Sequence, residues 1–325
     1  MIFALDPFDE SYSPLSGNPL QLIDLPGDEA PAAPIRIGVD REGLLPPCDV
    51  ELFDALVTTS AAAPAPWVSV SAGRLESALK RVSANIRRAP VAASILARLL
   101  RLGVGLSFDA ALAMESFAYS TLLGGTEFKC WLAERPASQP APISLAPVRY
   151  SRTGDDVILT LSAPETRNAM TAAMRDALYE SLFNALHDPT QPRVELRGEG
   201  RSFSVGGDLQ EFGSATDLAT AHIIRMQRSA ALLIHALGDR ASVRLHGACI
   251  GSGIEIAAAA TRRVAERDFY MQLPELGMGL IPGAGGTITL PRAIGRQRTF
   301  WAAAGGFRIP VDTALAWGLL HAAEP

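Results

Sequence analysis

Apolar and polar residues alternate differently in the two halves of the chain. Residues 1–34 show no sustained period and predict an irregular arm. Residues 35–40 then predict a strand, Asp49 predicts the cap of a short helix over 49–56, and residues 67–71 predict a second strand. Apolar residues recurring every three to four positions predict helices over 74–88, 90–102 and 108–123, followed by a short helical turn.

The second half mixes strands with helices. A linker with four prolines occupies residues 135–147. Beyond it the pattern predicts a hairpin over 148–162, and then strands over 194–199 and 241–250 between helical segments. This alternation indicates an α/β layered domain. We therefore expect an arm with a small strand–helix–strand unit (1–66), a helical segment (67–134), the linker (135–147) and a core (148–325).

Composition and charge narrow the function classes. Apolar residues make up 48% of the chain and charged residues 19%, as in globular rather than disordered proteins. The net charge of −5 argues against nucleic-acid binding, and three scattered cysteines and five scattered histidines predict neither a disulfide framework nor a metal site. The acidic N-terminus does not resemble a signal peptide and no long apolar run is present, so we expect a soluble, cytoplasmic protein.

Two glycine-containing junctions are candidate sites. Gly206 and Gly207 precede Asp208, whose spacing from Glu211 is that of a capping box, so a helix is predicted to begin at Asp208. Residues 251–253 lead into a second helix. The first amides of a helix lack acceptors, so two such amides aimed at one point would stabilise an oxyanion. Either junction alone is more often a simple tight turn.

Two glutamates are the candidate acid–base groups. Glu255 lies in the first turn of an Ala- and Ile-rich helix, but its spacing from Ser252 also fits a capping box. Glu275 follows Pro274 among apolar and glycine residues. It lies either at a solvent-facing strand end or in an apolar pocket, where a raised pKa would suit proton transfer. Local spacing does not decide between these readings.

Taken together, four segments resemble the crotonase (enoyl-CoA hydratase/isomerase) superfamily. The resemblance runs from about residue 148 to the end of the chain and rests on SAPETRNAMTAAM, GRSFSVGGDLQEF, the long segment from LHGACIGSGIEIAAAATRR to LPRAIG, and ALAWGLLHAAEP. It implies a spiral of ββα units that binds an acyl-coenzyme A thioester. Coenzyme A is then part of the substrate, and no metal or redox cofactor is implied.

The resemblance also implies a role for each site residue. The amides of Gly207 and Ser252 fall at the oxyanion-hole positions, Glu255 at the position that activates water, and Glu275 at the position that exchanges a proton at Cα. Further positions fall where relatives bind coenzyme A: Arg167, Asn168, Ala169, Gly206, Asp208 and Leu209.

The chain departs from the family pattern in three places. Ser252 stands where glycine is usual, and Gln210 stands where a basic residue often meets the coenzyme phosphates. Residues 73–134 resemble the family's C-terminal helices but precede the core, which predicts a circular-permutation-like order; an unrelated helical domain is the alternative. In the family these helices cap the acyl pocket and form trimers, so we expect a homotrimer or a dimer of trimers. The stripe Ile95, Leu99 and Leu100 is either that interface or a buried face.

The expected activity is enoyl-CoA hydration, the syn addition of water to a 2,3-double bond. The alternatives are another crotonase reaction (isomerisation, retro-Claisen hydrolysis or cofactor-free oxygenation) and a non-catalytic acyl-CoA-binding subunit. Aromatic and Met residues that either wall the acyl pocket or belong to the core are Phe203, Phe212, Met226, Met271 and Phe300.

Overall fold

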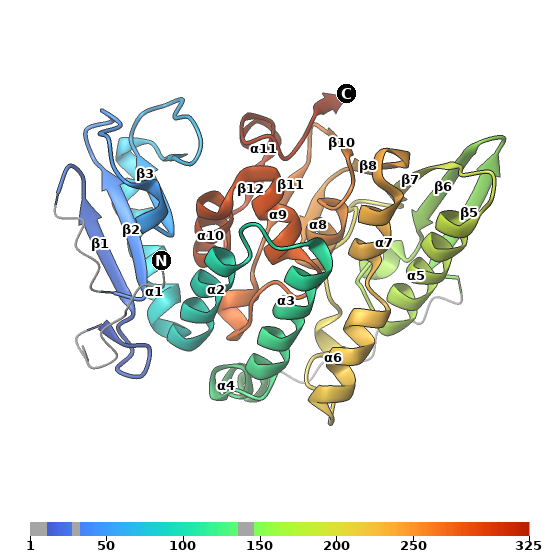
Figure 1. Ribbon diagram of the computed structural model, residues 1–325, viewed down its shortest axis with the longest axis horizontal. Coiled ribbons are helices and arrows are strands. Elements are labelled where there is room, and N and C mark those ends of the chain that lie inside the picture. Colours follow the sequence, from blue (N-terminus) through green and yellow to red (C-terminus); the bar gives the residue numbers. More distant parts are fainter. Residues whose placement is uncertain (1–11, 28–32, 136–145, 325) are drawn as a thin grey trace.

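The computed structural model describes residues 12–27, 33–135 and 146–324. Most of the predicted linker and the first part of the predicted arm lie outside the described residues. Figure 1 shows a small sheet at one end, a central layer of helices and a large sheet at the other end. No helix among the described residues combines the length and apolar character needed to cross a bilayer.

The large sheet forms the frame of the core. Its six strands lie in the order β13-β10-β8-β7-β6-β5, all parallel except for the antiparallel β5–β6 pair. Turn residues at Gly154 and Asp155 close this pair, so the predicted hairpin is confirmed. The strands are β5 (Val148–Thr153), β6 (Asp156–Leu161), β7 (Arg193–Gly198), β8 (Ala241–Leu245), β10 (Arg262–Glu266) and β13 (Ala322–Glu324).

A smaller sheet and several helices complete the core. The small sheet has the order β12-β11-β9, with β9 parallel and β12 antiparallel to β11. Its strands are β9 (Ala248–Ile250), β11 (Tyr270–Gln272) and β12 (Ile309–Pro310). The helices are α5 (Ala172–His187), α6 (Leu218–Gln227), α7 (Ala230–Leu237), α8 (Ser252–Ala257), α9 (Gly286–Ile294), α10 (Arg296–Gly305) and α11 (Val311–Ala316), with 3₁₀ turns η3 (Pro164–Thr166), η4 (Leu209–Glu211), η5 (Gly238–Arg240) and η6 (Glu275–Met278).

The N-terminal unit is a parallel sheet rather than a strand–helix–strand. Its strands are β1 (Leu20–Asp24), β2 (Ile35–Asp40), β3 (Ala55–Thr58) and β4 (Val68–Ser69), paired in that order. The stretch predicted as an irregular arm therefore contributes β1. The predicted helix after Asp49 is only the 3₁₀ turn η2 (Val50–Leu52), because the apolar residues that follow it are fully buried as β3.

Four helices join the N-terminal sheet to the core. They are α1 (Ala72–Arg88), α2 (Pro90–Leu102), α3 (Phe108–Leu123) and α4 (Thr126–Glu134). Helices α1 and α2 pack on α10, α2 and α3 pack on α9, and α4 packs on η6. Leu99 and Leu100 are buried and Ile95 packs against the same core, so the stripe proposed as a subunit interface faces the chain's own interior.

A buried ion pair holds the N-terminal sheet to this layer. Asp54, which directly precedes β3, pairs with Arg101 of α2 and accepts a hydrogen bond from the amide of Arg36 at 2.9 Å. From the core side, Arg296 of α10 donates to the carbonyl oxygen of Phe53 at 2.7 Å. The sheet is therefore tied to both α2 and α10.

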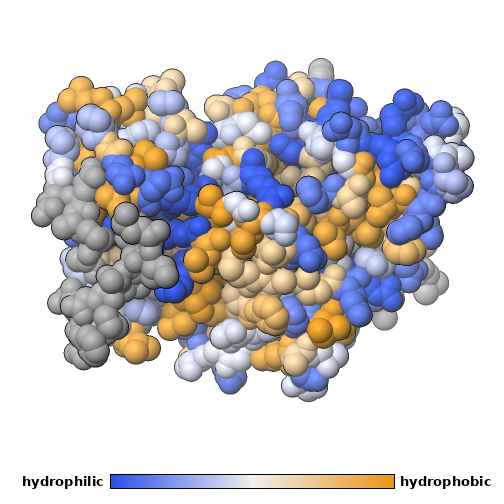
Figure 2. All heavy atoms as spheres, viewed as in Figure 1, coloured by the Kyte–Doolittle hydropathy of each residue, from blue (hydrophilic) through white to orange (hydrophobic). Residues whose placement is uncertain are grey.

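Apolar side chains also reach the surface of the central layer. Figure 2 shows them gathered on the face to which α3 and α6 contribute. On these two helices, which pack against each other, Phe117 is 59% exposed and Ile223 is 50% exposed.

Candidate active site

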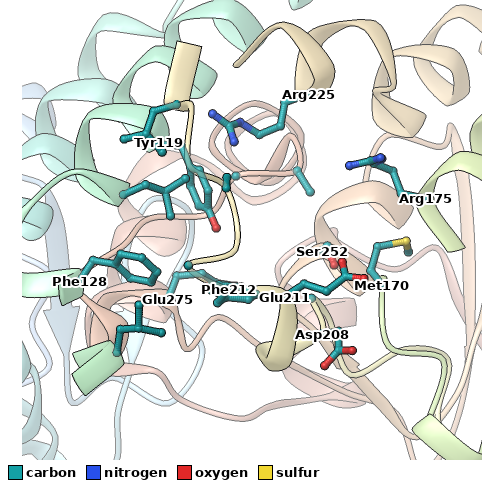
Figure 3. A pocket seen from close by; sticks show the side chains of 18 of the residues that line it. Tyr119, Phe128, Met170, Arg175, Asp208, Glu211, Phe212, Arg225, Ser252 and Glu275 are labelled. Atoms are coloured by element: carbon teal, nitrogen blue, oxygen red, sulfur yellow. The ribbon is translucent and has the colours of Figure 1, made fainter. Parts of the chain in front are cut away.

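A cavity of about 520 Å³ lies between the helical segment and the core. Figure 3 shows side chains entering it from several elements. All four residues predicted for catalysis line it: Gly207, Ser252, Glu255 and Glu275. The rest of its wall comes mainly from α3, α4, the segment 208–218 and Arg225 of α6. The tertiary structure therefore brings the four predicted residues together from separate parts of the core.

The two predicted oxyanion donors keep their amides unbonded. Neither the N–H of Gly207 nor that of Ser252 donates a hydrogen bond to any residue in the described part of the chain. Around Gly207 the backbone is fixed by Met170, whose N–H donates to Gly206 at 2.7 Å and whose oxygen accepts from Asp208 at 3.3 Å. Both amides are therefore available to a ligand in the cavity.

The predicted helix at Asp208 is not formed. Only the three residues of η4 follow it, and the Asp208 carboxylate accepts from the amide of Gln210 at 3.0 Å. The carboxylate of Glu211 makes no hydrogen bond with the amide of Asp208 and instead accepts one from the amide of Ala172 at 2.8 Å. The capping-box interpretation is therefore wrong here. The chain instead turns so that the ring of Phe212 lies over Gly207. A Cβ atom at Gly207 would lie 2.8 Å from this ring.

Glu255 points into the core rather than back to its own helix. The side chain is 2% exposed, and Oε2 accepts from the amides of Ala284 at 2.7 Å and Gly286 at 3.0 Å. No capping bond to Ser252 is made, so the second capping box is also wrong. Burial raises the pKa of Glu255 to about 7, and the amide bonds limit the rise because they stabilise the anion.

Glu275 is buried with fewer hydrogen bonds than Glu255. It begins η6, is 8% exposed, and its Oε2 makes no hydrogen bond with a described residue. Burial, with the charge of Glu255 second, raises the pKa of Glu275 well above its ordinary value.

The two acids face each other across Gly251. A Cβ at Gly251 would lie 2.6 Å from Oε1 of Glu275 and 3.9 Å from Oε1 of Glu255. Gly251 has φ +49°, and the left-handed backbone together with the adjacent carboxylate leaves no room for a side chain. Of the two readings left open for Glu275, the pocket rather than the solvent-facing strand end is observed.

A third carboxylate, Glu115 of α3, was not predicted. It is 1% exposed; Oε1 accepts from the amide of Gly285 at 2.7 Å, and Oε2 accepts from the amide and hydroxyl of Thr287, both at 2.8 Å. Four successive amides, those of residues 284–287, thus alternate between Glu255 and Glu115. Burial first, and then the charge of Glu255, raises the pKa of Glu115 to about 8. The only sequence signal is an acid in a predominantly apolar helix.

The helical segment also supplies a wall of the cavity. The ring of Tyr119 packs directly on Gly283, where a Cβ would come within 2.4 Å of it, and Phe128 lies nearby on α4. Of the proposed pocket walls, Phe212 lines this cavity and Met226 lines an adjoining one. The others are fully buried in the core: Phe203, Met271 and Phe300.

Of the six residues predicted to contact coenzyme A, one lines the cavity and five do not. Asp208 lines the cavity, and Arg167 is exposed with φ +55°. The side chain of Asn168 is fully buried; its Oδ1 accepts from Ala163, and its Nδ2 donates to backbone oxygens of residues 199–203. It therefore has no donor left for a coenzyme. Positions that do not line the cavity are Arg167, Asn168, Ala169, Gly206 and Leu209.

Comparison with known proteins identifies the family. Residues 156–325 match the family model of enoyl-CoA hydratase/isomerase. The chain belongs to this family. The matched region contains the four predicted catalytic residues, and the predicted α/β crotonase-like class is confirmed. In the part of the chain that the structure describes, no three His, Cys, Asp or Glu side chains are grouped to hold a metal ion.

Individual members of the enoyl-CoA hydratase/isomerase family show the extent of the match. A probable enoyl-CoA hydratase of Bacillus subtilis is 32% identical over 165 residues, covering 50% of this chain and 63% of that protein. One of Rhodobacter capsulatus is 31% identical, covering 55% of this chain and 68% of that protein. The crystal structure of enoyl-CoA hydratase from Thermoplasma volcanium matches with a TM-score of 0.50 at 30% identity, covering 55% of this chain and 71% of that one. The chain thus spans about two thirds or less of the length of several relatives it matches.

Proposed function

We propose that the protein is an enoyl-CoA hydratase, which adds water across the 2,3-double bond of an enoyl-CoA thioester. One observation carries the proposal. Two buried carboxylates, Glu255 and Glu275, face each other beside the unbonded amides of Gly207 and Ser252 in one cavity.

The two amides provide the site for the thioester oxygen. Addition at Cβ moves the double-bond electrons toward the carbonyl, so negative charge develops on that oxygen. Two fixed N–H donors would stabilise the enolate, and removing one such donor from an oxyanion hole typically costs a factor of about 10² to 10³ in kcat. Because Gly207 and Ser252 have no other acceptor, they form these bonds without breaking any within the described chain.

Glu255 is suited to activate the water. Its Oε2 is held by two amides, which fixes the carboxylate and favours the ionised form. In the proposed step Glu255 takes one proton from water, and the oxygen forms a bond to Cβ. The pKa of about 7 places this base near neutral pH, where general bases are most effective.

Glu275 is suited to supply the second proton. Burial raises its pKa well above the usual value, and its Oε2 lacks the amide donors that stabilise the anion of Glu255, so we assign the proton to Glu275. The enolate electrons form a bond from Cα to this proton, which leaves Glu275 as the carboxylate. Transfer of the proton from Glu255 then restores both acids, and the net reaction consumes one water.

We further infer that residues 73–134 take the place of the family's C-terminal helices. Support comes from their contacts, since α3 and α4 wall the cavity while α1 and α2 pack on α10. Moving residues 73–134 behind residue 325 through a flexible linker is expected to give a folded, hydrating enzyme. An inactive product with intact secondary structure would contradict this inference. Homotrimer formation is a separate prediction, for which light scattering in solution is the test.

The catalytic proposal is tested by Glu255→Gln and Glu275→Gln, with Glu266→Gln on β10 as the control because Glu266 does not line the cavity. Loss of the enoyl-thioester absorbance is followed for enoyl-CoAs of several chain lengths. Each active-site variant should lose about 10² to 10⁴ in kcat, while the control stays near the unsubstituted protein.

Each other outcome has a defined meaning. Undiminished hydration in either glutamine variant refutes the assigned roles. A requirement for only one acid, together with double-bond migration, favours isomerisation. If an enoyl-CoA binds but none of any length is turned over, the chain is a non-catalytic acyl-CoA-binding subunit.

A further inference from the structure

A second, smaller cavity extends the proposed acyl site. It measures about 120 Å³, is more enclosed than the main cavity and adjoins it, since the same residues line both: Met170, Arg175, Arg225, Gly283 and Ala284. Most of its wall is apolar, and Ser116 and Glu115 of α3, which line only this smaller cavity, add polar groups to it. A mostly apolar wall with a few polar groups is typical of a small-molecule site, in which the polar groups fix the orientation of the ligand.

Arg225 of α6 lines both cavities, and hydrogen bonds to one neighbouring helix hold its guanidinium. Nε donates to the hydroxyl of Ser116 at 3.1 Å. Nη2 donates to the hydroxyl of Ser120 and to the main-chain carbonyl oxygen of Ser116. Its guanidinium lies 5.0 Å from the centre of the Tyr119 ring, and Figure 3 shows the side chain reaching from α6 toward this ring. Nη1 has no hydrogen bond with a described residue.

The other arginines of these cavities have carboxylate partners and Arg225 does not. Arg175 pairs with Asp176 at 2.9 Å, and Arg228 lies 3.7 Å from Glu180. In the described part of the chain no carboxylate oxygen lies within 4 Å of Arg225, which is half-buried. Burial removes water from the Arg225 guanidinium and is the main cause of its lowered pKa. The groups that accept its hydrogen bonds belong to serines and are neutral.

We propose that the acyl group of the substrate carries a carboxylate at its far end, which Arg225 binds where the two cavities adjoin. This inference rests on the proposed function and names its substrate class, an enoyl-CoA derived from a dicarboxylic acid. A guanidinium held by two serines presents its remaining N–H groups in a fixed direction, which is the arrangement that recognises a carboxylate.

The nearby acids do not oppose this placement. Glu115 lines the smaller cavity, but both of its oxygens already accept hydrogen bonds, from Gly285 just before α9 and from Thr287 within it. Burial also raises the pKa of Glu115 to about 8, so its carboxyl is largely uncharged near pH 7. Glu255 likewise accepts hydrogen bonds from Ala284, just before α9, and from Gly286 at its start. A coenzyme phosphate is the other anion that would suit Arg225, and the binding of free coenzyme A distinguishes it from an acyl carboxylate.

The test compares matched substrates on the full-length protein. The pairs are hex-2-enedioyl-CoA with hex-2-enoyl-CoA, and the corresponding five-, seven- and eight-carbon compounds. The variants are Arg225→Met, which removes the charge at similar length, and Arg267→Met as control, because Arg267 is exposed and lines neither cavity. Binding of adipyl-CoA, hexanoyl-CoA and free coenzyme A, which cannot be hydrated, is measured by calorimetry.

We expect kcat/KM to favour the carboxylated member of at least one pair about ten- to hundredfold, the contribution of hydrogen bonds to a charged group. Arg225→Met should remove this preference, and should weaken adipyl-CoA binding relative to hexanoyl-CoA by a similar factor. Arg267→Met should change neither ratio.

Two results overturn the inference, and a third separates it from the hydratase proposal. Equal or better turnover of all the unsubstituted enoyl-CoAs, with unchanged ratios in Arg225→Met, refutes it and leaves the hydratase proposal intact. Equal weakening of free coenzyme A and both acyl-CoAs assigns Arg225 to a coenzyme phosphate. If no enoyl-CoA is hydrated, the hydratase proposal fails, but the calorimetric ratio still decides whether Arg225 binds a carboxylate.

Discussion

Replacing Glu115 by glutamine tests whether a residue of the helical segment positions the catalytic base. Three donors point at the two oxygens of Glu115: the amides of Gly285 and Thr287 and the Thr287 hydroxyl. Glutamine keeps one oxygen and turns a donor group toward the partners of the other. At least one buried amide is then left without an acceptor, at about 1–3 kcal/mol each. Because burial raises the pKa of Glu115 to about 8, the side chain is largely uncharged near pH 7, and the lost hydrogen bonding is the main cost. We therefore expect the free energy of unfolding to fall by about 1–3 kcal/mol.

The catalytic effect follows from the alternation of the four amides. The amides of Ala284 and Gly286 hold Glu255, and those between and after them belong to Glu115. If the segment shifts, Glu255 shifts with it, and misplacement by about 1 Å costs roughly 10²-fold in rate. We therefore expect kcat to fall about ten- to hundredfold and KM to change much less, because neither oxyanion amide is touched.

The measurements are steady-state hydration of an enoyl-CoA and urea unfolding. Glu127→Gln is the matched control, since Glu127 also accepts from two amides, those of Val91 and Ala92 at 2.8 and 3.0 Å, but it does not line the cavity. It should lose stability and keep its kcat. If Glu115→Gln loses stability but retains kcat to within twofold, Glu115 has only a structural role and the positioning argument is wrong.

Three further predictions concern the same site. As pH rises through about 7, kcat/KM should rise because Glu255 ionises, and it should fall at higher pH where Glu275 loses its proton; a pH-independent rate would contradict both assignments. Burial raises the pKa values of Glu115, Glu255 and Glu275 above the unfolded value of about 4.3, so the folded chain binds more protons than the unfolded chain. The free energy of unfolding, measured by urea titration, should therefore decrease as pH rises from about 5 to about 8. Ser252→Pro removes the amide N–H at the first position of α8, where proline is tolerated, and should lower kcat about 10²-fold or more. Ser252→Ala keeps this N–H and is the control. An equal loss of kcat in Ser252→Ala would assign the effect to the hydroxyl.

The local pattern of the sequence was sufficient for much of the molecule. Apolar periodicity located α1, α2 and α3, and the turn at Gly154 and Asp155 predicted the β5–β6 hairpin. The residues that gather in the cavity, Gly207, Ser252, Glu255 and Glu275, were assigned from the resemblance to the family, because local spacing alone left their roles open. The signals for the helices and the hairpin each lie within a short stretch of chain, where neighbouring residues determine the conformation.

Where contacts join distant segments, the local pattern failed. Asp208 and Glu211 have capping-box spacing, yet Glu211 bonds to Ala172, and the chain turns at Phe212 instead of forming a helix. The stripe containing Leu99 looks the same in sequence whether it meets a second subunit or the chain's own core.

Only the tertiary structure revealed Glu115 and Arg225 as parts of the site. Glu115 meets amides about 170 residues further along the chain, and Arg225 meets serines more than 100 residues before it. No periodicity links such positions. Sequence therefore determined which chemical groups the protein carries and the helices and hairpin that hold many of them. Packing of the helical segment against the core decided which groups lose their water, and hence which pKa values are raised and where the cavity closes.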